Sequence, residues 1–130
     1  MFNKFKAYAS FSAPDIAAIK EFYNGKLGLE INEEMGQGGI SFKTEGGLIF
    51  FVYYKPNHVP AEFTVLNFIV EDIEAAVKEL NSKGITMEQY NYPELKTNEL
   101  GIAENMGGNG NSKMAWFKDP AGNIVSVGTI

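Results

Sequence analysis

The sequence contains no cysteine and no arginine, and it has a single histidine, His58. Without cysteine there are no disulfides, thiolate metal sites or cysteine nucleophiles, and a reducing compartment is compatible with that composition. Without arginine the chain lacks the guanidinium fork that usually binds phosphate or carboxylate in a bidentate way. Eleven lysines face sixteen carboxylates, which gives a net charge of −5, whereas nucleic-acid binding depends on a basic face. We therefore expect neither nucleic acid nor a phosphorylated molecule as a partner.

Long apolar runs are also missing. No stretch approaches the roughly 18 apolar residues of a membrane-spanning helix, and the lysine-containing start has no apolar run of signal-peptide length. We expect a cytoplasmic, soluble protein with no membrane partner. With 130 residues, 45% of them hydrophobic and 13% aromatic, the chain is long enough to bury a core without a covalent staple.

An internal repeat is the strongest positive signal. Phe11 and Asp15 recur as Phe68 and Asp72, both shifted by 57 positions. Each aspartate precedes apolar residues at helical spacing, and its side chain can accept hydrogen bonds from the unpaired amides of a first helical turn. The sequence therefore predicts two copies of one supersecondary unit.

Each copy is predicted to contain one strand, one helix and three further strands. For the first unit, about residues 5–54, the elements are expected at 5–12, 15–24, 29–33, 40–43 and 47–54. Residues 55–61 hold two prolines and form the connector. For the second unit, about 62–130, they are expected at 63–70, 72–82, 85–90, 113–118 and 123–128. Residues 92–112 show no clear period and are interpreted as a binding loop or lid. We expect the two units to form one domain spanning residues 1–130.

Two segments carry a resemblance to a known family. FYNGKLGLE at 22–30 and WFKDPAGN at 116–123, together with the order of the elements, resemble the vicinal oxygen chelate superfamily of glyoxalases, bleomycin-resistance proteins and extradiol dioxygenases. The resemblance implies an α+β fold in which two βαβββ units pair their curved mixed sheets around a central cleft, with the helices outside. It also implies a homodimer.

Metal-using members of that superfamily place four ligands, usually His, Gln or Glu, in the first and fourth strands of each unit. Counting from the capping aspartates and from the hairpin glycines, with Gly46 taken as the equivalent of Gly122, gives the corresponding positions here. They are Tyr8, Phe50, Val65 and Ser126. None of these side chains is a competent ligand for Zn, Ni or Fe, and a one-residue slip to Phe51 or Ala9 does not restore one. We expect no metal, no cofactor and no catalytic residue.

Aromatic and apolar side chains instead predict a binding surface, because concave apolar pockets with few polar groups are the usual form of small-molecule sites. The predicted ligand-binding residues are Tyr8, Phe50, Val52, Val65, Trp116, Ile124 and Ser126. Tyr90 and Tyr92 are predicted at the rim of the pocket. His58 lies in the connector and is interpreted as a solvated loop residue.

Three functions follow from this lining. The first is metal-independent binding of a small apolar, aromatic or cationic molecule, as in the bleomycin-resistance branch. The second is a metal-dependent lyase, isomerase or dioxygenase of the same superfamily. The third is a non-catalytic interaction module whose cleft is filled by its own side chains.

Overall fold

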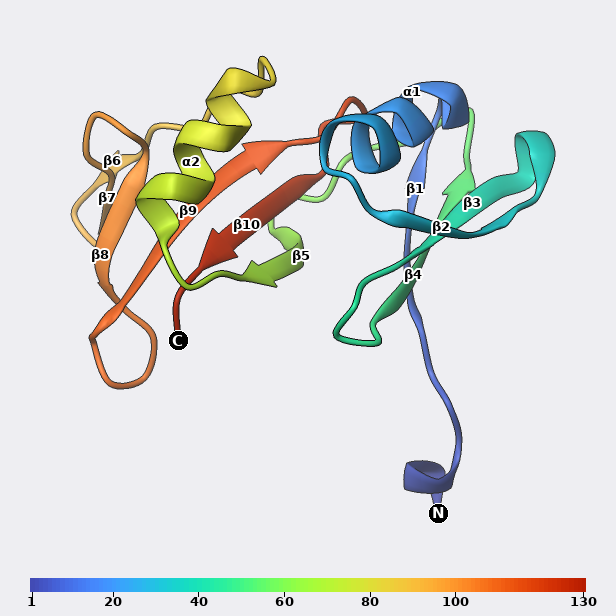
Figure 1. The fold of residues 1–130 in the computed structure, drawn as a ribbon, viewed down its shortest axis with the longest axis horizontal. Helices are drawn as coiled ribbons and strands as arrows, with labels where there is room; N and C mark the ends of the chain where they lie inside the picture. The colour runs from blue at the N-terminus through green and yellow to red at the C-terminus, as the bar shows by residue number, and fades with distance from the viewer. The chain divides into compact units, whose positions relative to one another are not determined.

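Each half of the chain folds into a four-stranded mixed sheet with a helix on one face (Figure 1). The computed structural model describes residues 1–130, which divide into two compact units, Met1–Pro60 and Ala61–Ile130. The strand order is β1-β4-β3-β2 in the first unit and β5-β10-β9-β8 in the second. In both, the first strand pairs in parallel with the last, and the other pairs are antiparallel. The predicted α+β class and the two βαβββ units are thus confirmed.

In the first unit a short 3₁₀ helix precedes the sheet, and a π-helical turn extends the α-helix. The elements are η1 (Phe2–Lys4), β1 (Ala9–Ala13), α1 (Ile16–Lys20), η2 (Glu21–Lys26), β2 (Glu30–Glu34), η3 (Gly36–Gly38), β3 (Gly39–Lys43) and β4 (Ile49–Tyr54). Asp15 caps α1, because its carboxylate accepts a hydrogen bond from Ala18 N at 3.1 Å, as predicted.

Aromatic rings fill the space between this helix and its sheet. Tyr23, Phe42 and Phe50 are all fully buried, and their ring centroids lie 5.4 to 5.5 Å apart. Phe11 stacks on Phe50 at 5.7 Å. Such ring pairs add to the free energy gained by burying the aromatic surface itself, so this cluster is the core of the first unit.

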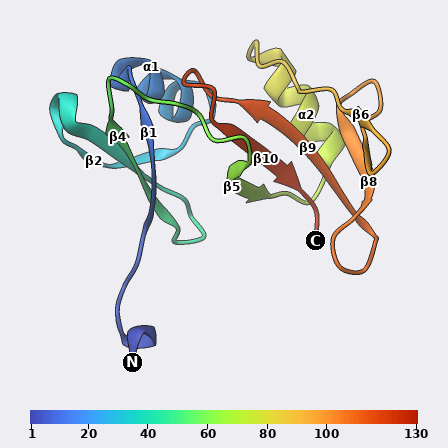
Figure 2. The same cartoon turned by 180° about the vertical axis from the view of Figure 1, so that it is seen from behind.

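In the second unit a longer connection joins the helix to the next strand of the four-stranded sheet. The elements of this unit are β5 (Thr64–Ile69), α2 (Ile73–Ser82), β6 (Asn91–Tyr92), β7 (Leu95–Lys96), β8 (Ile102–Met106), β9 (Ser112–Lys118) and β10 (Ile124–Gly128). The Asp72 carboxylate caps α2 through Ala75 N at 3.1 Å. The helix lies across one face of the sheet (Figures 1 and 2), and it buries Ile73, Val77 and Leu80.

The strand predicted at 85–90 is wrong. Only Met87 pairs there, in an isolated bridge with Phe117. The strand that follows α2 in the four-stranded sheet is instead β8, which lies inside the stretch predicted to be irregular. The β6–β7 hairpin lies between them. Sequence periodicity missed β8 because burial along it does not alternate, with Ile102 and Ala103 both buried, and because its register shifts between Ala103 and Met106.

The two terminal hairpins use the same turn. Gly47 N donates to Thr44 O at 3.0 Å, and Gly122 N donates to Asp119 O at the same distance. Both glycines have positive φ, +90° and +82°, a backbone conformation that other residues rarely adopt. Gly47, rather than Gly46, is therefore the counterpart of Gly122, and the predicted equivalence was off by one residue.

Candidate functional site

The turn register decides which side chains of β4 point away from the helix. β1 pairs with β4 so that Ala9 lies opposite Phe50, and β5 pairs with β10 so that Leu66 lies opposite Val125. Ala9 and Leu66 are related by the same 57-position shift as the rest of the repeat. Phe50 therefore corresponds to Val125, and Phe51 corresponds to Ser126.

The assignment of Phe50 and Val52 to the ligand-binding face is consequently wrong. Both side chains are fully buried, and Phe50 packs against Tyr23 of η2 at 5.5 Å. Since successive strand residues point to opposite faces, the open face of the first sheet carries Phe51 and Tyr53, whose rings lie 6.2 Å apart.

A cavity of about 830 Å³ lies on this open face. Its apolar and aromatic lining comes from Tyr8, Met35, Ile49 and Phe51. Tyr8 directly precedes β1 and is 67% exposed, so its phenol is accessible to a ligand. The lack of a side chain at Gly39 leaves room for the Phe51 ring, because a Cβ at Gly39 would lie 2.5 Å from Phe51 Cε1.

Polar groups in the cavity are few, and two of them are hydrogen-bonded to each other. Asn32 Nδ2 donates to Ser41 Oγ at 3.1 Å, and Ser41 is only 5% exposed. Lys6 and Glu33 contribute one charge of each sign to the lining. The cavity has the dimensions and the mainly apolar lining with a few convergent polar groups that are typical of small-molecule sites.

On the second sheet the corresponding side chains are buried by their neighbours. Ser126 Oγ donates to Asn67 Oδ1 at 2.6 Å and is 1% exposed. Val125 and Phe117 are fully buried, and Ser126 and Trp116 occupy the alternate positions of β10 and β9, opposite each other. Their side chains therefore share the face away from Val125 and Phe117.

Trp116 is covered on that face. It is 7% exposed, and the Tyr90 ring meets it edge-on at 5.5 Å. Tyr92, which is 55% exposed, stacks on Tyr90 at 6.2 Å. Burial raises the pKa of the Tyr90 hydroxyl, and the neighbouring Glu88 carboxylate and Tyr92 raise it further. The structure thus brings Trp116, Tyr90 and Tyr92 together, with Tyr90 between the buried indole and the exposed Tyr92 ring.

The other predicted residues lie nearby on the second sheet. Ile124 is half-buried at the start of β10, two residues before Ser126. Val65 is also half-buried and falls where the register between β5 and β10 shifts.

His58 is not the solvated residue that the sequence predicted. It is half-buried, and its Nδ1 lies 2.6 Å from Ser12 Oγ in β1. A histidine in a proline-rich connector gives no sequence signal for this contact, because its partner lies 46 positions away.

The ligand positions of metal-using relatives do not fit a transition metal here. With the corrected register they are Tyr8, Phe51, Val65 and Ser126, which offer a phenol, a phenyl ring, an isopropyl group and a hydroxyl that already donates to Asn67. Zn, Ni and Fe sites use imidazole, thiolate and carboxylate donors. Across residues 1–130 no three His, Cys, Asp or Glu side chains gather in a way that could hold a metal ion.

The duplicated sheet topology defines the class: an α+β protein with two βαβββ units. The family model of the Glyoxalase/Bleomycin resistance protein/Dioxygenase superfamily matches residues 7–127. The chain belongs to this superfamily, and the resemblance of 22–30 and 116–123 is confirmed.

Solved structures share the fold across the whole chain. The glyoxalase family protein from Enterococcus faecalis is 24% identical, with 98% of this chain and 99% of that one covered and a TM-score of 0.70. Lactoylglutathione lyase from Agrobacterium tumefaciens is 20% identical, with 96% and 92% covered and a TM-score of 0.67. A glyoxalase/bleomycin resistance protein from Catenulispora acidiphila is 19% identical, with 97% and 98% covered and a TM-score of 0.62.

No curated protein sequence matches the chain significantly. None of its helices combines the length and the apolar character needed to span a membrane.

Proposed function

We propose that this protein binds a small aromatic or apolar molecule, without a metal ion, on the open face of its first sheet. The observation that carries the proposal is the 830 Å³ cavity lined by Tyr8, Met35, Ile49 and Phe51. Superfamily membership supports it at the level of the fold only, since one fold hosts many activities.

The lining favours a flat ligand with one polar group. The rings of Tyr8 and Phe51 offer faces for stacking, and the Asn32–Ser41 pair supplies hydrogen-bonding groups at 3.1 Å from each other. Glu33 adds a carboxylate to the lining, so a ligand with a positive charge is also accommodated. We infer that the activity is sequestration, because the lining holds a molecule mainly through apolar and aromatic contact and contains no group of His, Cys, Asp and Glu side chains that could hold a metal ion.

Calorimetric titration against a panel of flat aromatic and cationic compounds tests the proposal. We expect Phe51→Ala to weaken binding about tenfold, because one aromatic contact that is desolvated on binding contributes on the order of 1 to 2 kcal/mol. Tyr8→Ala should weaken it to a similar extent. Phe63→Ala, which removes an exposed aromatic ring (69%) from the second unit, is the matched control and should leave the affinity unchanged.

Two results would count against this function. If no compound in the panel binds, or if the parent and Phe51→Ala proteins bind with equal affinity, the first sheet is not the binding surface. Stoichiometric Zn, Ni, Mn or Fe in protein purified without chelator would favour the metal-dependent lyase, isomerase or dioxygenase instead.

A further inference from the structure

The first seven residues form an arm that buries nothing of its own. Phe2 and Phe5 are 79% and 62% exposed, and no residue of η1 is buried. The two rings contact each other edge-on at 5.5 Å, because residues three apart share one side of a 3₁₀ turn. A pair of exposed rings on one side of a segment is the kind of apolar feature that marks an interaction surface.

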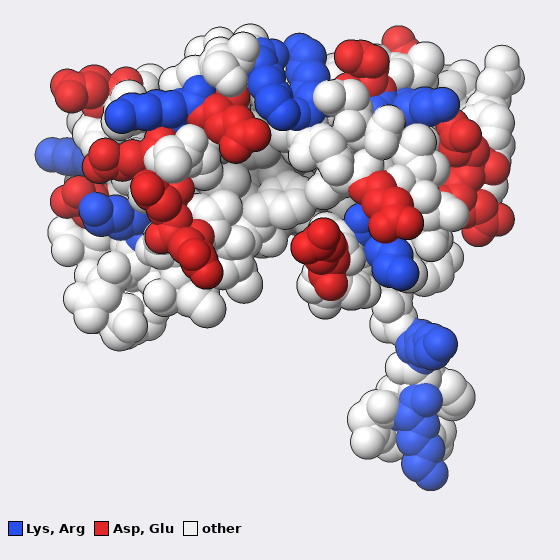
Figure 3. Space-filling model, viewed as in Figure 1, with Lys and Arg blue, Asp and Glu red and all other residues white.

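The arm is also basic on an acidic protein. It carries Lys4 and Lys6 and no carboxylate, while residues 8–130 carry nine lysines and sixteen carboxylates, a net charge of −7. Figure 3 shows blue and no red on the arm that extends from the body at the lower right. Its charge is therefore complementary to the body of the same kind of chain.

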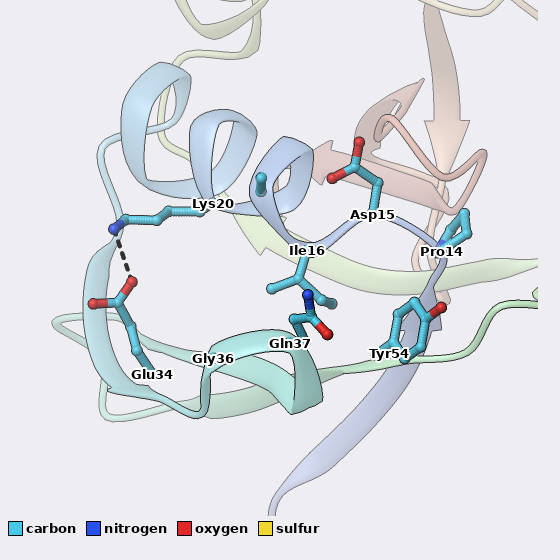
Figure 4. A pocket seen from close by; sticks show the side chains of 9 residues that line it. Pro14, Asp15, Ile16, Lys20, Glu34, Gly36, Gln37 and Tyr54 are labelled. Atoms are coloured by element: carbon cyan, nitrogen blue, oxygen red, sulfur yellow. Dashed lines mark ion pairs between the residues drawn. The ribbon is translucent and has the colours of Figure 1, made fainter.

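A pocket of about 420 Å³ on the first unit has the matching chemistry (Figure 4). Pro14, Ile16 and Tyr54 give it apolar and aromatic walls, and Asp15 and Glu34 place carboxylates at its edge. The single cation in the lining, Lys20, is paired with Glu34 at 2.8 Å, which leaves the pocket with a net negative charge. An aromatic ring flanked by a lysine is complementary to such a pocket.

The arm and the pocket lie at opposite ends of β1. The arm precedes the strand, whereas Pro14 and Asp15 follow it directly, and the arm extends away from α1 (Figure 1). Two copies with their β1 strands antiparallel about a two-fold axis would bring each arm to the pocket of the other copy, and an interface of this kind closes at two subunits. We propose that residues 1–5 of one copy, which carry Phe2 and Phe5, dock into the Pro14–Ile16–Tyr54 pocket of a second copy, reciprocally, while Lys6 and Ala7 stay at the cavity of their own chain.

An anionic membrane is the competing destination for a basic aromatic arm. Lipid-binding segments usually gather four to eight basic residues, and this arm has two lysines attached to a body with a charge of −7. The electrostatics therefore favour a second copy of the chain.

The first experiment measures the mass of the full chain by light scattering over a range of concentrations. We expect a dimer whose dissociation constant rises about 100-fold in Phe2→Ala/Phe5→Ala, because each dimer loses four rings. The control is Phe63→Ala, which removes an equally exposed ring, 69%, outside the arm and should leave the dimer intact. A monomer at all concentrations, or a dimer unaffected by the arm variant, overturns the proposal. So does arm-dependent flotation of the protein with anionic vesicles in place of dimerisation.

The second experiment locates the arm, using the absence of native cysteine. Phe5→Cys protein is mixed with Gln37→Cys protein under mild oxidation, since Gln37 also lines the pocket. We expect a disulfide-linked dimer of the two variants, and none when Asn109→Cys replaces Gln37→Cys. Equal cross-linking to Asn109→Cys overturns the assignment of the pocket. In the double variant Phe5→Cys/Gln37→Cys, a disulfide within one chain at high dilution would show that the arm folds back onto its own unit and would also overturn the exchange.

Discussion

The two units share one topology and differ in how their open sheet faces are occupied. In the first unit the face is hollow, with Phe51 at the position that Ser126 holds in the second. In the second, Ser126 is hydrogen-bonded to Asn67, and Tyr90 covers Trp116.

The length of one connection explains much of this difference. Three residues join η2 to β2 in the first unit, whereas the path from Ser82 to Ile102 in the second holds Tyr90, Tyr92 and the β6–β7 hairpin. That longer path supplies the ring that covers Trp116. The comparison indicates that the duplicated sheets determine topology, while a single connection determines whether a face stays open.

The largest expected effect separates the two faces of β4. Phe50→Ala should lower the free energy of unfolding by about 3 to 5 kcal/mol, because it leaves a cavity among Tyr23, Phe42 and Phe11. Phe51→Ala, the same change on the open face, should cost less than about 1.5 kcal/mol. Urea unfolding measures both. Equal losses would contradict the register that places the two rings on opposite faces.

A smaller effect should distinguish the two terminal hairpins. The Asp119 carboxylate is buried and accepts from Ala121 N, Asn123 N and Asn123 Nδ2 at 2.8 to 3.0 Å. Asp119→Ala should therefore lower the stability by about 2 to 3 kcal/mol, since it leaves buried donors unpaired. Thr44 holds the matching turn position in the first unit, and Thr44→Ala should change the stability by less than about 0.5 kcal/mol. Similar losses in thermal unfolding would refute this asymmetry.

The equivalence of Gly47 and Gly122 predicts matched losses. An alanine at either position is strained by the positive φ and should cost about 1 kcal/mol. Gly46→Ala is the control, because Gly46 has no positive φ and its nearest neighbour would be Thr44 Oγ1 at 3.8 Å. If Gly46→Ala destabilised the protein and Gly47→Ala did not, the original alignment of the turns would be restored.

The smallest effect concerns alkaline pH. Because the pKa of Tyr90 is raised above its usual value of 10.0, the unfolded state loses this proton first as the pH rises. The stability that the neutral phenol contributes is present below pH 10 and is lost as the pH rises through the pKa of Tyr90 in the folded state. Tyr90→Phe should flatten the fall in unfolding free energy above pH 10. A difference absorbance titration of the parent and variant proteins should show a phenol that titrates above 10.0, and a midpoint at or below it would contradict the raised pKa.

The repeat of Phe11 and Asp15 predicted the fold well because helix capping and helical spacing are local signals. Both aspartates cap their helices as expected. The missed features depend on tertiary contacts: β8 forms only where β9 pairs with it, and Ser12 reaches His58 across 46 positions.

The candidate site was predicted less well, for a specific reason. Strand alternation has a period of two, so one extra turn residue moves every side chain of the following strand to the other face. Choosing Gly46 over Gly47 placed Phe50 and Val52 outward. The positive φ of Gly47, which the sequence does not reveal between two adjacent glycines, corrects the choice, and the strand registers and the burial of Phe50 agree with it.

The long path from Ser82 to Ile102 also gives the molecule a region that can change at little structural expense. Its hairpin pairs only with itself, so insertions or deletions there would leave the ladders of both sheets intact. Changes of length in this hairpin can be followed through Trp116, the single indole of the chain, because its contact with the Tyr90 ring makes its fluorescence sensitive to the segment.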